Sequence, residues 1–219
     1  MKIDIHRHAH DRGNADQMIR NLFHDQTDQL DDEHYYSVGL HPWHVDQDSL
    51  MDDLEAVTAI AHHPQILAIG EAGLDKSIKT SLKLQTEAFE QQIAFAVKYE
   101  KPMIIHCVKA YNEVFDLKRN TGYDKAWIIH WYNASGEMGI QLSRHGFYLS
   151  FGHMLFNENS KAFHAFKGIP LQHIFLETDD SEYTIDKIYS KAAYLRNIPV
   201  SDLEAQLEKN FHTCFGIHP

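Results

Sequence analysis

Five short apolar runs, each ending in a residue that can bind a metal ion, constrain the fold of this chain more than any other feature. The first run, MKIDIHRH, has isoleucines at positions 3 and 5 and ends in His6 and His8. Residues i and i+2 of a β-strand face the same side, so this spacing predicts two adjacent imidazoles, the commonest metal-binding side chains. The other four runs are Ile66–Glu71, Pro102–His106, Ala126–His130 and His173–Asp179. Together they predict strands that converge on one metal centre.

Strands and helices alternate along most of the chain. From the third strand onward, each predicted strand is followed by a predicted helix, and this alternation is typical of a parallel sheet. The predicted strands are Met1–His8, Gln17–Phe23, Tyr35–Leu40, Ile66–Ile69, Met103–Cys107, Ala126–Trp131, Phe147–Phe151 and Ile174–Thr178. The predicted helices are Asp48–His62, Ser81–Tyr99, Ala110–Asn120, Gly136–His145, Asn159–Phe166, Ile185–Arg196 and Ser201–Phe215.

Eight such units predict a closed (β/α)8 TIM barrel. The first two connections are too short for full helices, so we expect the barrel to be incomplete in its first helices. Catalytic groups of these barrels lie at the C-terminal ends of the strands, where every ligand candidate here falls. At 219 residues the chain fits one domain over residues 1–219, since single barrels commonly reach ~250 residues.

Composition excludes several classes of protein. The net charge of −11 opposes general binding to nucleic acid or to anionic membranes, so a phosphate-bearing substrate has to be attracted locally, as bound metal ions would do. Two cysteines provide no disulfide framework, and no apolar run approaches the ~18 residues of a membrane span. The chain begins with strand-like residues rather than a signal peptide. We therefore expect a cytoplasmic enzyme, with no membrane association and no evident obligate protein partner.

Four histidines and two acids are the ligand inventory for two divalent metal ions. Any one of them alone is also consistent with a core histidine or a solvated acid, but a buried Glu71 would need a cation. Spacing does not choose between Glu177, Asp179 and Asp180 for the last ligand. With Asp179 in that role, we expect one metal on His6, His8 and Asp179, a second on His106 and His130, and Glu71 bridging them.

Such paired metals can hold a hydroxide between them and clamp a phosphate or acyl group. Asp179 can also accept the proton of the attacking water as general base. The mixed nitrogen and oxygen donors suit Zn²⁺, Mn²⁺ or Fe²⁺ and tolerate Mg²⁺.

The same motifs, in the same order, resemble the TatD family of metal-dependent hydrolases over nearly the whole chain. They are D-x-H-x-H at Asp4–His8, GLHPW at Gly39–Trp43, GEAGLD at Gly70–Asp75, Ile-His at 105–106 and 129–130, and LETD at Leu176–Asp179. The Asn210-Phe211 and Phe215-Gly216 pairs are similar to the closing helix of that family.

The resemblance implies a TIM barrel of the amidohydrolase superfamily and metal-dependent deoxyribonuclease activity, with 3′–5′ exonuclease action on single-stranded DNA or another phosphodiester partner. It also implies the metal ligands, and it selects Asp179 over its acidic neighbours. The implied ligands are His6, His8, Glu71, His106, His130 and Asp179.

The chain departs from the family in the loops expected to contact substrate. Val108 stands where the family usually has Arg, and the adjacent Lys109 is a different kind of phosphate contact. His130–Ala134 reads HWYNA in place of the family's H-x-F-S-G, and Asp180–Tyr183 replaces a Pro-rich loop. The metal ligands are retained while the loops differ, so the pattern predicts the metal site more directly than the substrate.

The candidate substrate contacts are His41, Trp43 and Lys109. His41 is expected either to hold a phosphate oxygen or to support a ligand. Trp43, and also Tyr132, are candidates for stacking on bases, although aromatic residues at a barrel mouth also serve as packing. The alternative function is hydrolysis of a small ester, amide or phosphodiester by the same two-metal site. A binding protein that keeps the ligands for stability alone is the third reading.

Overall fold

The structure, a computed structural model, describes residues 1–8 and 15–217. The chain divides into two compact units, which we describe separately: a first unit of residues 1–19 and 128–219, and a second unit of residues 20–127. The prediction of one domain over residues 1–219 stays a prediction.

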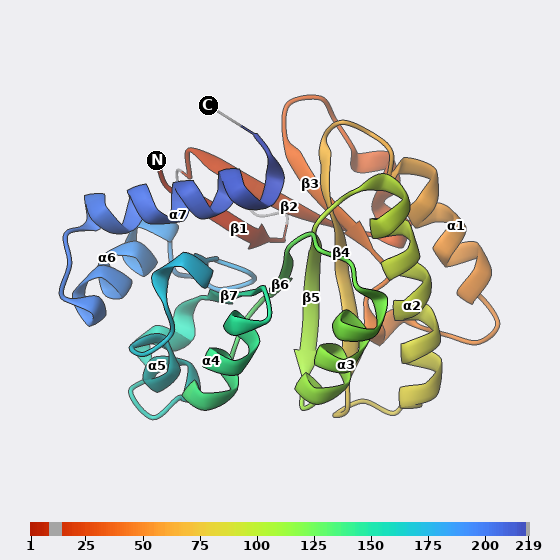
Figure 1. The fold of residues 1–219 in the computed structure, drawn as a ribbon. Coiled ribbons are helices and arrows are strands. Elements are labelled where there is room, and N and C mark those ends of the chain that lie inside the picture. Colours follow the sequence, from red (N-terminus) through yellow and green to blue (C-terminus); the bar gives the residue numbers. More distant parts are fainter. Residues whose placement is uncertain (9–14, 218–219) are drawn as a thin grey trace. The chain divides into compact units, whose positions relative to one another are not determined.

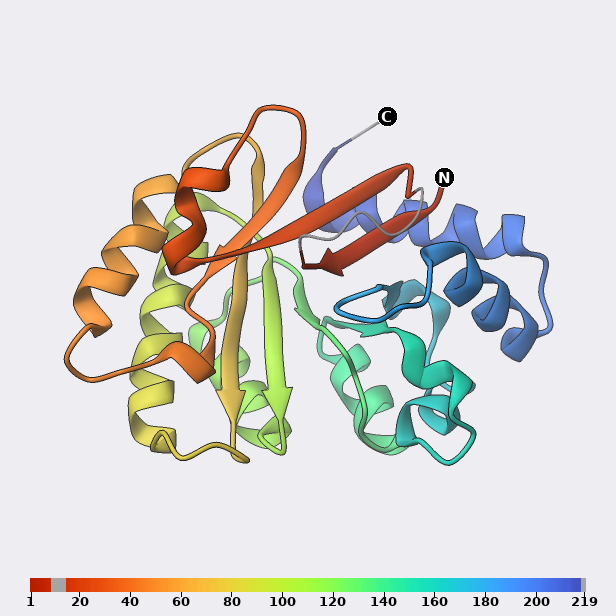
Figure 2. The same ribbon diagram turned by 180° about the vertical axis from the view of Figure 1, so that it is seen from behind.

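The second unit is built on the three parallel strands β3 (Tyr35–Gly39), β4 (Ile66–Asp75) and β5 (Met103–Val108). In the pairing of β4 with β5, Gly73 lies opposite His106. Figures 1 and 2 show β4 and β5 side by side, with α2 alongside them. The helices of this unit are α1 (Leu50–Ile60), α2 (Leu82–Tyr99) and α3 (Tyr111–Thr121), together with the 3-10 turns η1 (His24–Gln29) and η2 (Pro42–His44).

Apolar side chains of β3 and α1 form a core cluster in the second unit. Val38 and Leu40 lie two residues apart and therefore face the same side. They pack with Leu54 and Val57, which lie about one helical turn apart on α1. The buried amide of Gln92, on α2, accepts a hydrogen bond from the Leu40 N–H and donates one to the Leu40 carbonyl. This pair of bonds holds the C-terminal end of β3, directly before His41.

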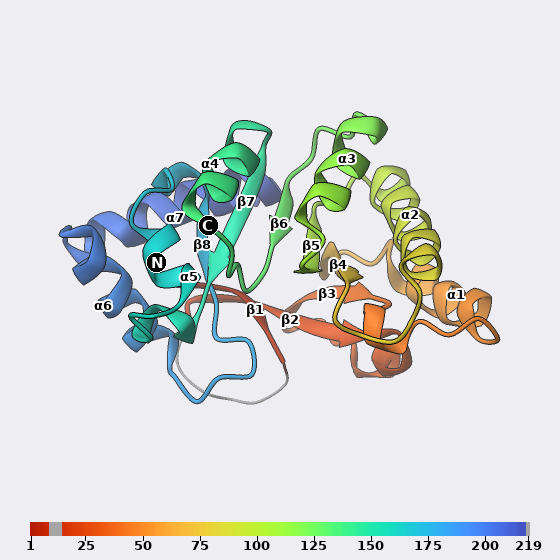
Figure 3. The ribbon, with the colours of Figure 1, turned by 90° about the horizontal axis from the view of Figure 1, so that it is seen from below.

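The first unit contains β1 (Ile3–Arg7), β7 (Phe147–Phe151) and β8 (Ile174–Leu176). β7 and β8 pair in parallel, and just beyond β8 Asp179 forms a parallel bridge with Arg7 and donates its N–H to the His6 carbonyl at 3.0 Å. Figure 3 shows α6 and α7 side by side in this unit. The helices and 3-10 turns are α4 (Gly136–Arg144), α5 (Lys161–Phe166), α6 (Ile185–Arg196), α7 (Val200–Phe215), η3 (His153–Phe156) and η4 (Leu171–His173).

The strand order confirms the predicted fold class. β2 (Gln17–Phe23) and β6 (Trp127–Ile129) contain the boundaries of the two units, and the eight strands follow one another in chain order in one sheet. With helices after the later strands, this is the (β/α)8 class. Within the described residues, the first two connections carry only the 3-10 turn η1, as their shortness predicted.

Several element boundaries differ from the sequence expectation. β4 continues to Asp75 instead of ending at Ile69, because Gly70 and Gly73 lie so close to β5 that only glycine fits there. β6 ends at Ile129, two residues early. α7 begins at Val200, one residue before the expected start at Ser201, and Ser135 caps α4 by accepting the Met138 N–H.

None of the described helices combines the length and the apolar character that crossing a membrane requires.

Gly73→Ala should strongly destabilise the protein. A Cβ at position 73 would overlap the backbone carbonyl of His106, and Gly73 has φ +151°, a conformation that side chains rarely adopt. We expect a loss of about 2–4 kcal/mol in the free energy of unfolding, measured by urea denaturation. Gly168→Ala is the matched control, because a Cβ there meets nothing within 4 Å. Equal midpoints for the two variants would contradict this account of β4.

Asp4 should make stability depend on pH in a defined direction. Asp4 is fully buried and accepts hydrogen bonds from the Thr178 N–H (2.9 Å) and hydroxyl (2.6 Å). Burial raises the pKa of Asp4 from 3.8 to about 6, and these hydrogen bonds offset only part of that effect. The folded state therefore holds this proton more tightly than the unfolded chain, and the resulting stabilisation is complete below pH 4 and lost as the pH rises through 6.

Asp4→Asn removes that dependence. Measured in chelator by urea unfolding, the stability of the wild type relative to Asp4→Asn should fall by roughly 3 kcal/mol between pH 4 and pH 7. A difference that stays constant over this range would show that the folded-state pKa of Asp4 is not raised.

Candidate metal centre

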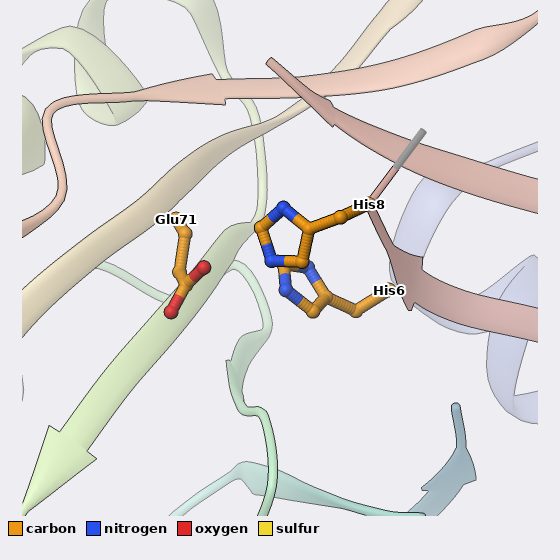
Figure 4. A group of neighbouring side chains, drawn as sticks. All are labelled: His6, His8 and Glu71. Carbon is orange, nitrogen blue, oxygen red and sulfur yellow. The ribbon is translucent and has the colours of Figure 1, made fainter. Parts of the chain in front are cut away.

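The first unit gathers three histidines around Asp179. His6 lies on β1 and His8 directly follows it, and Figure 4 shows both rings projecting from this end of the strand. Their Nε2 atoms lie 3.8 Å and 3.4 Å from Asp179 Oδ1. The ring centroid of His130 lies 4.4 Å from that of His6. Donor atoms of His6, His130 and Asp179 all lie within 4.8 Å of one another, so this group can hold a cation.

The neighbouring acids of Asp179 have other positions. Glu177 accepts a hydrogen bond from the Trp131 N–H and lies 3.9 Å from His130 Nδ1. Burial raises the pKa of Glu177 to about 8; the nearby His130 lowers it in part, and Asp179 raises it further. Asp180 is exposed, with one donor atom near those of His8 and Asp179.

The second unit places Glu71 between two imidazoles. Glu71 is buried on β4, and its carboxylate is drawn in Figure 4. Its Oε1 lies 2.8 Å from His106 Nδ1 and 3.0 Å from His41 Nε2. The Glu71 N–H donates to Asn21 Oδ1 at 2.8 Å, which fixes the backbone at this point. Donor atoms of His41, Glu71 and His106 all lie within 4.8 Å of one another, and Glu71 and His106 are the two of these that the sequence predicts as metal ligands.

The hydrogen bonds of His41 distinguish it from a metal ligand. The Trp43 backbone N–H donates to His41 Nδ1 at 3.1 Å, so a neutral His41 ring carries its proton on Nε2. That Nε2–H is directed at Glu71. His41 is therefore held as a hydrogen-bond donor, which fits contact with a carboxylate or phosphate oxygen rather than metal ligation.

His106 lies between two carboxylates. Because it pairs with Gly73, it sits opposite the middle of the segment from Glu71 to Asp75. Its Nδ1 meets Glu71, and its Nε2 lies 3.2 Å from Asp75 Oδ2. The indole Nε1–H of Trp43 donates to the same Asp75 oxygen at 2.9 Å. His41, Glu71, His106, Asp75 and Trp43 thus form a closed ring of polar contacts.

The donor spacing in each unit is compatible with a shared ion. Nitrogen and oxygen ligands of one ion, each ~2.1 Å from it, lie about 3.0–3.4 Å apart at angles of 90–109°. The shortest separations here are 2.8 Å for His106 to Glu71 and 3.4 Å for His8 to Asp179. Movements of a few tenths of an ångström would therefore suffice for these residues to ligate a metal.

The predicted substrate contacts have different surroundings. Trp43 is 64% exposed, and Lys109 is exposed just beyond β5, with φ +56°. Tyr132 is fully buried and its hydroxyl donates to the Ser135 carbonyl, so of the two roles considered for it the structure supports packing and not stacking on bases. Trp131 takes the outward position instead, at 43% exposure and φ +42°.

Sequence reasoning missed Asp75, Asn21 and Glu177 as parts of the two groups. Asp75 stood in the GEAGLD motif, and that position was the available signal. Nothing in the local sequence marks Asn21, whose Oδ1 also accepts the Ser37 hydroxyl hydrogen bond at 3.2 Å. Glu177 was considered only as a competitor of Asp179.

Comparison with known proteins places these groups in a family context. The model of the family described as TatD related DNase matches residues 23–216. A Bacillus subtilis protein named uncharacterized metal-dependent hydrolase YabD is 34% identical over 66% of this chain and 58% of its own length. A Citrobacter rodentium protein named 3′-5′ ssDNA/RNA exonuclease TatD is 27% identical over 82% of this chain and 71% of its own length. The chain thus spans somewhat more than half of YabD.

Solved structures have the same fold. The crystal structure of YJJV, a TatD homologue from Escherichia coli, superposes with a TM-score of 0.85 at 19% identity, covering 99% of this chain and 98% of that one. A TatD-family hydrolase from Entamoeba histolytica gives 0.80 at 15% identity, covering 99% and 98%. With a family match over most of its length and this fold, the chain belongs to the TatD-related DNase family, whose curated relatives include proteins named as metal-dependent hydrolases.

Proposed function

We propose that this protein is a metal-dependent nuclease that hydrolyses phosphodiester bonds of single-stranded DNA from the 3′ end. The observation that carries the proposal is the buried Glu71 carboxylate, with His106 and His41 nitrogens 2.8 Å and 3.0 Å from one of its oxygens, in a chain of the TatD-related family. The exonuclease named from Citrobacter rodentium supports the choice of substrate. We further propose one catalytic domain, acting in the cytoplasm.

In this proposal, two divalent ions use the ligand set inferred from the sequence. His6, His8 and Asp179 would hold one ion, His106 and His130 would hold the other, and Glu71 would be a ligand of both. Zn²⁺, Mn²⁺ and Mg²⁺ all accept such nitrogen and oxygen donors. When bound, the ions supply charge that stabilises the developing negative charge on the phosphate and lower the pKa of a water molecule.

The residues of the chain supply the remaining chemistry. Asp179 accepts the proton of the attacking water, because it is the acid beside His6 and His8. His41, held as an Nε2–H donor, hydrogen-bonds a non-bridging phosphate oxygen. Trp43 presents an exposed indole for stacking on a base, and Lys109 provides an exposed charge for a phosphate.

Hydrolysis of a small ester, amide or phosphodiester is the second candidate. The observation that favours it is at the end of β5. This chain has Val108 there, where the family usually has arginine, and valine has no charge with which to bind phosphate. A site without that charge would depend on its metals to attract an anionic substrate.

Glu71→Ala should abolish nuclease activity while the protein stays folded. End-labelled single-stranded DNA is incubated with Mg²⁺, Mn²⁺ or Zn²⁺, and we expect stepwise shortening by the wild type. Loss of the shared ligand should lower kcat by more than ~10³-fold, the scale of losing a main electrostatic group. Glu90→Ala, an exposed glutamate on α2, is the matched control.

Retained turnover in Glu71→Ala would exclude the two-metal assignment. If the wild type binds metal yet cleaves no DNA with any of the ions, the DNA proposal is wrong, and small esters and phosphodiesters become the substrates to test.

Lys109→Ala should raise KM for single-stranded DNA by about 2- to 5-fold with little change in kcat, since an exposed ion pair contributes ~1 kcal/mol or less. Lys83→Ala, which removes an exposed lysine on α2, controls for the change in net charge. Initial rates at low ionic strength give the most sensitive comparison. The same rise in KM for both variants would mean that Lys109 acts only through the overall charge.

A further inference from the structure

Trp43 is highly exposed, yet its side chain is hydrogen-bonded to a buried residue. Its indole is 64% exposed, yet the indole N–H donates at 2.9 Å to Asp75, which is only 1% exposed. An exposed tryptophan usually has rotational freedom, and here a hydrogen bond to a buried carboxylate removes it. The anchored ring centroid lies 4.9 Å from that of His41 and 6.0 Å from that of His106.

Asp75 forms hydrogen bonds through its side chain and through its backbone. Oδ1 accepts hydrogen bonds from the Ser77 N–H (2.7 Å) and from the Ser77 hydroxyl. Its backbone N–H donates to Gln85 Oε1 at 2.7 Å, and the Gln85 amide donates to its carbonyl at 3.0 Å. These hydrogen bonds fix the position of the Asp75 carboxylate.

Oδ2 accepts the Trp43 indole N–H and lies 3.2 Å from His106 Nε2. The other ring nitrogen, Nδ1, lies 2.8 Å from Glu71, so the two contacts alone do not choose the tautomer. If Nδ1 binds a metal ion, the ring proton has to be on Nε2, and Asp75 is the carboxylate that accepts it. The orientation of a predicted metal ligand and that of a predicted substrate contact therefore depend on one oxygen atom.

We propose that Asp75 is a positioning residue that sets His106 for metal binding through Nδ1 and, with the same oxygen, holds Trp43 as a rigid stacking surface for a nucleobase. The inference rests on the proposed function, because it takes His106 as a metal ligand and a nucleic acid as the substrate. It assigns a fixed distance between the stacked base and the metal ligand, which a mobile tryptophan would not provide.

An amide cannot replace this carboxylate. The Trp43 Nε1–H and the Ser77 N–H, one at each oxygen, can only donate. Whichever way an asparagine at position 75 is turned, its NH2 group therefore faces an N–H. Asp75→Asn should weaken the hold on both His106 and Trp43, although it is nearly the same size.

The first test is metal affinity. Zn²⁺ is titrated into chelator-treated protein and followed by calorimetry, and Asp75→Asn should bind it 10- to 100-fold more weakly than the wild type. Ser77→Ala is the matched control, because it removes a hydroxyl from Oδ1 and leaves both contacts of Oδ2. Its Zn²⁺ affinity should stay within about twofold of the wild type, as expected for a group that does not touch His106.

The second test uses the wild type, so it does not depend on how a variant folds. Nitrogen-15 NMR of the Zn²⁺-loaded protein should show the His106 ring protonated at Nε2, with the signal assigned by its loss in His106→Gln. In iodide quenching of tryptophan emission, the Trp43 contribution is the difference between the wild type and Trp43→Phe. That contribution should be more quenched in Asp75→Asn than in the parent protein.

The outcomes separate the inference from the function on which it rests. Protonation of His106 at Nδ1, or equal Zn²⁺ affinity in the wild type and Asp75→Asn, would overturn the role of Asp75 and leave the nuclease proposal standing. A wild-type protein that binds no Zn²⁺, Mn²⁺ or Mg²⁺ would overturn both. Weaker Zn²⁺ binding in Asp75→Asn alone, with Nε2 protonated, supports the inference.

Discussion

The burial of carboxylates is the constraint on which the candidate site depends. Glu71 and Asp75 are both almost completely buried in the second unit, where an isolated carboxylate would cost several kcal/mol. Each lies close to nitrogen atoms: two imidazoles at Glu71, and an indole, an imidazole and the Ser77 N–H at Asp75. His106 touches both acids. A divalent cation next to Glu71 would add the compensation that a carboxylate in such surroundings needs.

The backbone of β4 makes this arrangement sterically feasible. The absence of a side chain at Gly73 lets β5 approach until His106 lies directly opposite. The His106 ring then faces an acid with each of its two nitrogens. In the first unit, the hydrogen bonds of Thr178 to Asp4 and of Asp179 to the His6 carbonyl join the end of β8 to β1, so Asp179 comes to lie beside His6 and His8. Both groups therefore rely on close contact between neighbouring parallel strands.

Residues near the strand ends show where sequence reasoning succeeds and where it stops. Alternation along a strand predicted correctly that His6 and His8 face the same side. Alternation does not extend past β6, which ends at Ile129, and Trp131 has φ +42°. Trp131 turns outward and Tyr132 enters the core. The Trp131 N–H bonds to Glu177, a residue 46 positions away in the sequence.

By itself, the sequence determined the number and order of the strands, the residue types at their ends and the family, because these follow from local periodicity and from motifs of a few residues. Only the tertiary structure decided that Asp75 joins His106 to Trp43 and that Glu177 is buried with its carboxylate at the Trp131 N–H. These contacts join residues 31, 32 or 46 positions apart in the sequence. The local sequence does not predict such partners, because they come into contact only when the strands pair.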